Sequence, residues 1–371
     1  MYFYYLTIII FFCFALYETY EPKVLGKMPA KNILIIIIST IFIIQLGLRW
    51  ETGSDWKPYL DHFDSQNILT PTKNPGFQFE AGYNLFVSSI KTIYNDYSFY
   101  LLIHAVIFFL LLKKGYEYFT PFSIISLLIF YVSFLGLWGA NRQFLAIGIG
   151  MLALIFLDKG KWKIFISLVG LACLFHTTAF LLLVFLFLKK KFSSKFLFIT
   201  IGVCIVVGAT PLPFKLFGLL GGVNDIITHR TEAYMENAKE SGAVAISVIG
   251  MIKRCLLFFI FYFFRDKIYK IFPKNNLIFN GYFVGICFYF IFYKSLPIMI
   301  SRGSVYFNML EPILIANLLI LSKDRIKVFF IQVVILIYCF ITVNQSIAAY
   351  PDAYDPYKGI FINKEYLRFN I

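Results

Sequence analysis

The chain has 371 residues, of which 60% are hydrophobic, 20% aromatic and only 15% charged. Soluble domains carry about a quarter charged residues, so this composition excludes an ordinary soluble protein and predicts a polytopic integral membrane protein. The net charge of +14 comes largely from lysines in short segments between apolar runs. Such segments are typical topology signals, and we therefore expect no nucleic-acid binding.

The apolar runs are continuous rather than alternating, which predicts one all-α helical bundle over residues 1–371 and not a β-barrel. They lie at about 2–17, 33–48, 98–112, 121–138, 143–157, 164–188, 196–210, 246–264, 277–293, 304–321 and 328–347. No basic residue precedes the first run and no small-residue cleavage site follows it, so we expect a retained span. The cysteines lie one per run without Cys-x-x-Cys spacing, as packed free thiols do.

The run 164–188 decides the topology because lysine clusters, DKGKWK and KKKFSSK, flank both of its ends. A single crossing would place one cluster outside, whereas two short helices that turn at FHTTA keep both clusters in the cytoplasm. The second choice also keeps Lys31, Lys113 and SKDRIK on that side. It predicts about 11–12 membrane segments, with external loops at 49–97 and 211–245.

The external loop 49–97 opens with RWETGSDW, in which Arg49, Asp55 and Trp56 lie at a helix end. An aromatic face beside carboxylates is typical of sugar binding, although a tryptophan belt with solvated charges looks similar. Glu80 begins a segment with helical spacing of apolar residues, which predicts an interfacial helix. The Glu80 carboxylate either binds sugar or faces water.

The segment GLWGANRQ places Arg142 and Gln143 between two apolar runs with almost no loop. An arginine at this depth is costly unless it is paired or solvated. It either reaches lipid headgroups or offers a planar fork of donors to phosphate oxygens. Arg302, in SLPIMISRG at the outer mouth of the run 304–321, has the same two interpretations.

His176 is the only histidine deep in a long apolar run. It either hydrogen-bonds a neighbouring helix or, if the chain turns at FHTTA, lies near the external side and removes a proton from a sugar hydroxyl. In the second external loop, Arg230 is a candidate sugar contact within a polar stretch that is otherwise a solvated connector. No Walker A loop, GxGxxG, HExxH or metal-spaced Cys/His cluster is present, so no metal site is predicted.

Four segments, in order, resemble motifs of the EpsG and Wzy-type polysaccharide polymerases. RWETGSDWKPYLDHF resembles their Arg-x-x-x-Gly-x-Asp-Tyr-x-x-Tyr segment, with Trp56 in place of the tyrosine, and NRQFLA resembles their Arg-Gln-x-x-Ala motif. FHTTAF is similar to Phe-His-x-x-Ala, and ISRGSVYF to Arg-x-x-x-Tyr-Phe. The resemblance covers most of the chain and implies a fold similar to the class C, lipid-carrier glycosyltransferases.

The resemblance implies a polymerase of the bacterial inner membrane that joins repeat units carried on undecaprenyl diphosphate at the periplasmic face. Arg49, Arg142, Arg302 and Gln143 are then the diphosphate-binding candidates. Trp56, Glu80 and Arg230 are the sugar-binding ones. His176 ranks before Asp55 as the base. No cofactor is implied, because the donor is itself a lipid-linked glycan, and the partners are this substrate, membrane lipid and a chain-length regulator. The product would be O-antigen of lipopolysaccharide, capsule or exopolysaccharide.

Two other classes stay open. A flippase of lipid-linked glycans would carry charges at the bilayer midplane and two related halves. Here Lys253 and Arg254 are the main buried charges, on one helix only, and the halves do not match. A membrane acyltransferase acting on sugars could also use a single intramembrane histidine.

Overall fold

The computed structural model describes residues 1–20, 29–66, 79–219 and 248–367. Across this part of the chain every regular element is a helix, which confirms the predicted all-α, polytopic membrane protein. Five helices are long and apolar enough to cross a membrane: α1 (Tyr2–Tyr20), α5 (Tyr97–Phe119), α7 (Asn141–Asp158), α13 (Asn275–Phe292) and α17 (Arg325–Ala349). The bent pair α9 (Ser194–Gly208) and α10 (Leu212–Leu219) would make a sixth span.

The remaining apolar runs form helices that do not pass this test of length and composition. They are α2 (Pro29–Gly47), α6 (Ser123–Ser133), η2 (Leu135–Leu137), α8 (Trp162–Cys173), η3 (Thr177–Phe187), α12 (Val248–Ile271), α15 (Val305–Asn308), α16 (Glu311–Asn317) and η5 (Leu318–Leu321). The run 164–188 is divided at the FHTT segment into α8 and η3, as predicted, and the return of the chain at this segment stays a prediction.

The run 304–321 forms the apolar helix Val305–Leu321, as predicted, with a distorted turn at Met309 and Leu310 between α15 and α16. The physical reason is Pro312, in the first turn of α16. Proline has no N–H to donate to the carbonyl four residues earlier, and its ring would clash with that carbonyl.

The chain forms two compact units, residues 1–180 with 319–371 and residues 181–318. In the first unit α5 packs against α2 and α7, α7 packs against α8, and α17 packs against α1 and α6. In the second unit α13 packs against α9, α12, α15 and α16. The prediction of a single domain over 1–371 stays a prediction.

One end of the first unit gathers the basic segments. Lys31 forms a 2.7 Å ion pair with the buried Glu18, and the Tyr20 hydroxyl donates to the Arg325 carbonyl. Lys159, directly after α7, lies over the ring of Tyr118, which is in the last turn of α5. The topology prediction requires the lysine clusters to lie on one side of the membrane, and these contacts within one unit agree with it.

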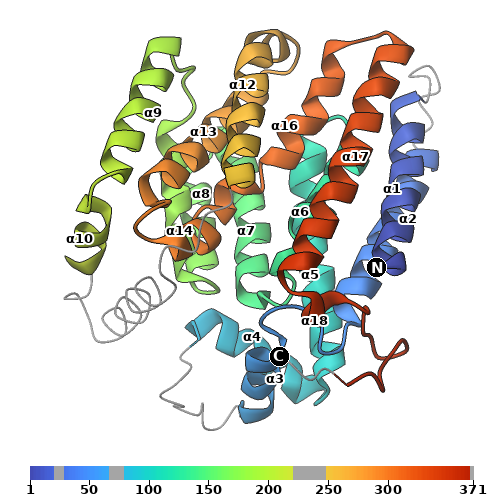
Figure 1. The fold of residues 1–371 in the computed structure, drawn as a ribbon. Coiled ribbons are helices and arrows are strands. Elements are labelled where there is room, and N and C mark those ends of the chain that lie inside the picture. The colour runs from blue at the N-terminus through green and yellow to red at the C-terminus, as the bar shows by residue number, and fades with distance from the viewer. Residues whose placement is uncertain (21–28, 67–78, 220–247, 368–371) are drawn as a thin grey trace. The chain divides into compact units, whose positions relative to one another are not determined.

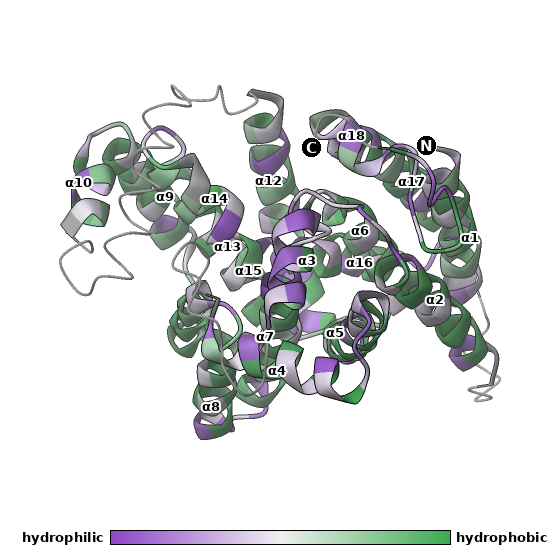
Figure 2. Ribbon diagram, turned by 90° about the horizontal axis from the view of Figure 1, so that it is seen from below, coloured by the Kyte–Doolittle hydropathy of each residue, from purple (hydrophilic) through white to green (hydrophobic). Residues whose placement is uncertain are grey.

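The opposite end carries α3 (Trp56–Ser65), α4 (Ala81–Ile93) and α18 (Pro351–Tyr354), which lie at the lower end of this unit in Figure 1. Figure 2 shows hydrophilic residues along α3, in contrast to the hydrophobic α2 and α6. The polar end of the unit therefore includes the RWETGSDW segment, and α4 follows Glu80 directly.

We predict that this polar end faces outward. A single cysteine at the exposed Asp61, in a variant without native cysteines, should react with an impermeant maleimide added to intact cells. Single cysteines at the exposed positions Lys161 and Ser194 should react only after permeabilisation. Labelling of position 194 in intact cells would exclude a return of the chain at FHTTA.

Candidate functional site

Two loops at the polar end of the first unit are interlocked through glycines. Gly53 and Gly139 have φ values of 109° and 106°, a region that side chains disfavour. The Ser54 amide donates to the Trp138 carbonyl at 3.1 Å, and a Cβ on Gly53 would lie 2.1 Å from that carbonyl oxygen. The RWETG loop can therefore approach the start of α7 only with glycine at position 53.

We expect Gly53→Ala to destabilise the protein by at least about 2 kcal/mol, because the clash adds to the backbone strain. Thermal unfolding followed by size-exclusion chromatography measures the loss. Gly170→Ala, in α8, is the matched control: a Cβ there meets nothing within 4 Å, and alanine favours a helix. An unchanged melting temperature for Gly53→Ala would contradict the interlocked geometry.

The C-terminal segment covers the RWETG loop. The Trp50 amide donates to the Lys358 carbonyl at 2.9 Å, and the Ile360 amide donates to the Leu48 carbonyl at 3.0 Å. The buried Lys358 ammonium pairs with Glu51, which has a positive φ of 43°. No local sequence pattern predicted this contact.

Arg49 joins the end of α2 to the start of α7. It is 2% exposed, and its two terminal nitrogens donate to the Leu46 carbonyl and, at 2.5 Å, to the Asn141 side-chain oxygen. Its fork is thus directed at protein acceptors. A diphosphate contact for Arg49 stays a prediction, and the observed contacts give it a positioning role.

Arg142 lies in the first turn of α7 and is held on three sides. Its Nη1 donates to Glu80 Oε2 at 2.6 Å, and its Nε donates to the Tyr59 hydroxyl at 3.1 Å. The guanidinium carbon lies 4.1 Å from the Phe79 ring centroid, a cation–π distance. Its side chain is 20% exposed, so the planar fork is fixed but still accessible.

Glu80 connects Arg142 to the FHTT segment. The Glu80 Oε1 atom accepts from the Thr177 amide at 3.2 Å and from the Thr177 hydroxyl at 3.0 Å. His176 lies next to these donors, and its Nδ1 is 2.7 Å from the Thr178 hydroxyl. The carboxylate thus brings together Arg142, on α7, and His176, in the turn between α8 and η3.

The charges around Glu80 keep it ionised. Burial alone would raise the pKa of Glu80, but the charges of Arg142 and His176 lower it to about 2. Because this pKa is lower than the ordinary value of 4.5, the ion pair stabilises the fold above about pH 4.5 and loses this effect only as pH falls toward 2. Burial and the charge of Arg142 lower the pKa of His62 to about 4, so His62 is neutral at pH 7.

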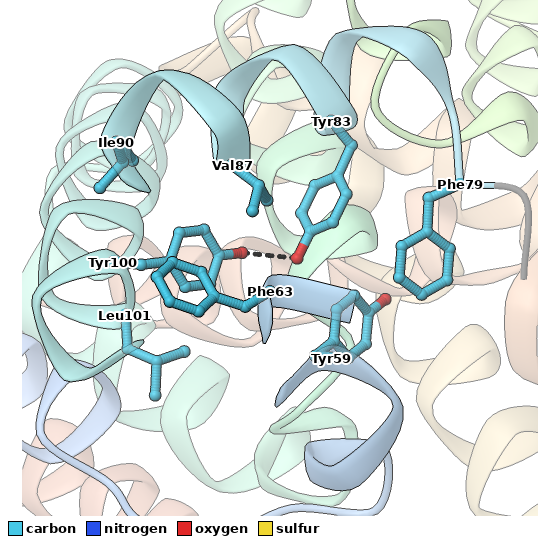
Figure 3. Packing of buried hydrophobic residues seen from close by; sticks show 8 residues of the cluster. All are labelled: Tyr59, Phe63, Phe79, Tyr83, Val87, Ile90, Tyr100 and Leu101. Atoms are coloured by element: carbon cyan, nitrogen blue, oxygen red, sulfur yellow. Dashed lines mark hydrogen bonds between the residues drawn. The ribbon is translucent and has the colours of Figure 1, made fainter. Parts of the chain in front are cut away.

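An aromatic cluster packs against Arg142. Figure 3 shows the Tyr59 and Phe79 rings beside Tyr83, whose hydroxyl is 2.6 Å from that of Tyr100. The cluster continues through Phe63, Val87, Ile90 and Leu101, so α3, α4 and α5 share one core. Tyr59 and Phe79 were not among the predicted site residues.

The other predicted residues are distributed as follows. Gln143 is buried next to Arg142, and Asp55 and Trp56 lie at the start of α3. The indole nitrogen of Trp56 is buried with no hydrogen-bond acceptor in the described chain. Arg302 ends α14 (Pro297–Arg302) in the second unit, and Arg230 lies outside the described residues.

At this end of the first unit the partly exposed Arg142 guanidinium lies beside the His176 segment, because both contact Glu80. No group of three His, Cys, Asp or Glu side chains in the described ranges is arranged to hold a metal ion. The fold and the site together define a polytopic membrane protein with a preorganised arginine–carboxylate centre at one end of a helical unit.

The chain belongs to the EpsG family, whose model matches residues 32–358. The match runs from α2 to Lys358, and so includes both interlocked loops and the FHTT segment, but not Ile360 of the C-terminal segment. Comparisons with curated proteins and with solved structures found no match. Family membership supports a general role in polysaccharide biosynthesis, of a polymerase type.

Proposed function

We propose that the protein joins oligosaccharide repeat units carried on undecaprenyl diphosphate, at the periplasmic face of a bacterial inner membrane. The observation that carries this proposal is the Glu80 carboxylate, which fixes Arg142 and the His176 segment together at one end of the first unit. A group that binds diphosphate and a group that accepts a proton are the two that such a transfer needs.

In the proposed reaction a sugar hydroxyl of the incoming unit attacks the anomeric carbon of the growing chain. The bond from that carbon to the diphosphate oxygen breaks, undecaprenyl diphosphate leaves with the electron pair, and the hydroxyl proton passes to the base. Arg142 stabilises the charge that develops on the leaving diphosphate, an effect that is usually a large part of catalysis. The donor carries its own activation, so the proposal needs no nucleotide sugar.

His176 is the proposed base, ahead of Asp55, because Glu80 places its segment beside Arg142. Trp56 is proposed to stack against a sugar ring, and a sugar hydroxyl would accept the hydrogen bond that its indole nitrogen lacks in the described chain. Glu80 is assigned to holding Arg142 rather than to the sugar. Sugar contacts of Arg230, diphosphate contacts of Arg302 and Gln143, a chain-length regulator as partner and a class C-like fold remain proposals.

The glycan profile of a deletion strain tests this function. Loss of long chains with single lipid-linked units retained at the periplasmic face supports the polymerase. Accumulation of units that face the cytoplasm would instead indicate a flippase, and chains of normal length without acyl groups would indicate an acyltransferase.

A further inference from the structure

Asn141, the first residue of α7, is held by side chains from two other segments. Its backbone carbonyl accepts a hydrogen bond from His104 Nε2 at 2.8 Å, and its side-chain oxygen accepts one from Arg49 Nη2 at 2.5 Å. His104 lies on α5, Arg49 follows the end of α2, and all three residues are at most 2% exposed. The residue that follows Asn141 is Arg142, so these contacts fix the chain next to the candidate site.

His104 makes one hydrogen bond within the described chain, and Asn141 is its partner. A carbonyl oxygen can only accept, so Nε2 carries the hydrogen. The other ring nitrogen, Nδ1, is buried and has no hydrogen-bond partner in the described residues. Burial of an imidazole inside a helical bundle is costly unless hydrogen bonds offset it. The contact with the Asn141 carbonyl is therefore the polar role that the structure gives to this ring.

Arg49 provides the second contact to Asn141. In the described ranges its guanidinium has no carboxylate partner and donates instead to neutral oxygens. One of them is the Leu46 carbonyl in the last turn of α2, where the helix dipole carries partial negative charge. The other is the Asn141 amide oxygen, so the arginine connects the end of α2 to the start of α7.

The start of α7 must be fixed for Arg142 to reach its own partners. The Nη1 and Nε atoms of Arg142 donate to Glu80 and Tyr59 at 2.6 and 3.1 Å. Both partners belong to the chain around α3 and α4, whereas Asn141 is tied to α5 and the end of α2. Hydrogen bonds weaken steeply outside a narrow range of distance and angle. A shift of the first turn of α7 by about 1 Å would therefore disturb both contacts, and misplacements of that size cost on the order of 10²-fold in rate.

We propose that His104 and Asn141 are positioning residues, which together with Arg49 form a clamp on the first turn of α7 and hold Arg142 at Glu80. The expected effect on rate rests on the proposed function, in which Arg142 stabilises the leaving diphosphate. The clamp itself, formed by Arg49, His104 and Asn141, does not depend on which reaction the protein performs.

Rates of glycan polymerisation by the full-length protein in liposomes test the effect on Arg142. His104→Phe keeps a ring but removes the donor, and should lower kcat on the order of 10²-fold with little change in KM, because Arg142 acts on charge that develops in the transition state. His104→Gln supplies an amide N–H to the same carbonyl and should retain most of the rate. Gln332→Leu is the matched control, because it removes another buried hydrogen bond of this unit, the one to Thr19 at the basic end. It should behave as the unmodified protein does.

Hydrogen exchange measured by mass spectrometry tests the clamp without the reaction. The amides of residues 138–146 should exchange about tenfold faster in His104→Phe than in the unmodified protein, and at the unmodified rate in His104→Gln and Gln332→Leu. If His104→Phe does not fold, Asn141→Ala, which removes the acceptor of Arg49, is compared in the same way with Asn141→Asp, which keeps it.

A normal kcat in His104→Phe would overturn the inference, and so would an equal loss of kcat in His104→Gln or in Gln332→Leu. If the unmodified protein forms no glycan ladder, the proposed function fails, and the exchange rates alone decide whether the clamp exists. Unchanged exchange of residues 138–146 in His104→Phe would overturn the clamp whether or not the protein forms a ladder.

Discussion

Arg142→Lys is expected to stop polymerisation almost as completely as Arg142→Ala, with a loss on the order of 10²–10³ in rate. Lysine keeps the positive charge but not the planar fork, which in the structure donates to Glu80 and Tyr59 through separate nitrogens. A compact ammonium cannot keep both contacts and still offer a donor to a diphosphate. Glycan ladders of cells that express each variant measure the effect.

Arg325→Lys is the matched control for this substitution, because Arg325 is exposed at the basic end of the same unit. It should leave the ladder unchanged, and immunoblots should show equal amounts of all the variants. A ladder of normal length from Arg142→Lys would mean that the side chain only anchors the loop to lipid headgroups, where lysine serves as well.

His176→Ala is expected to lower the rate of polymerisation by a factor on the order of 10²–10⁴, the usual effect of losing a general base. His176→Gln should keep a trace of activity if hydrogen bonding to the acceptor hydroxyl contributes. Both variants should reach the membrane in normal amounts, because the Thr177 contacts that tie the FHTT segment to Glu80 remain.

His62→Phe is the control for the histidine substitution. The imidazole of His62 is neutral at pH 7 and packs against the rings of Phe79 and Tyr83, so a phenyl ring should replace it with little loss of activity. If His176→Ala makes chains of full length, the proton is accepted elsewhere, and Asp55 becomes the first candidate.

The periodicity and the lysine clusters predicted the helices of this fold well. The apolar runs are long, and continuous apolar sequence has few structural solutions in a membrane. The division of the run 164–188 could be predicted because charges on both flanks excluded a single crossing. The distorted turn before Pro312 in the run 304–321 was not predicted, although proline was a local signal for it.

The candidate site was predicted less completely, for a physical reason. Arg142 and His176 stand out individually because a charged or titratable group in an apolar run is rare. Their connection through Glu80 depends on tertiary packing between α4, α7 and the FHTT segment, which no local pattern encodes. The Glu51–Lys358 pair was missed for the same reason, since more than three hundred residues separate its members.

We propose that this chain itself forms glycosidic bonds between lipid-linked repeat units. The most direct test is to reconstitute the purified protein in liposomes with undecaprenyl-diphosphate-linked repeat units from the native host, and to follow glycan length by gel electrophoresis. We expect a ladder of products with the unmodified protein, and no ladder with Arg142→Lys or His176→Ala. Single units that stay unchanged with folded, unmodified protein, or a ladder that persists in both variants, would contradict it.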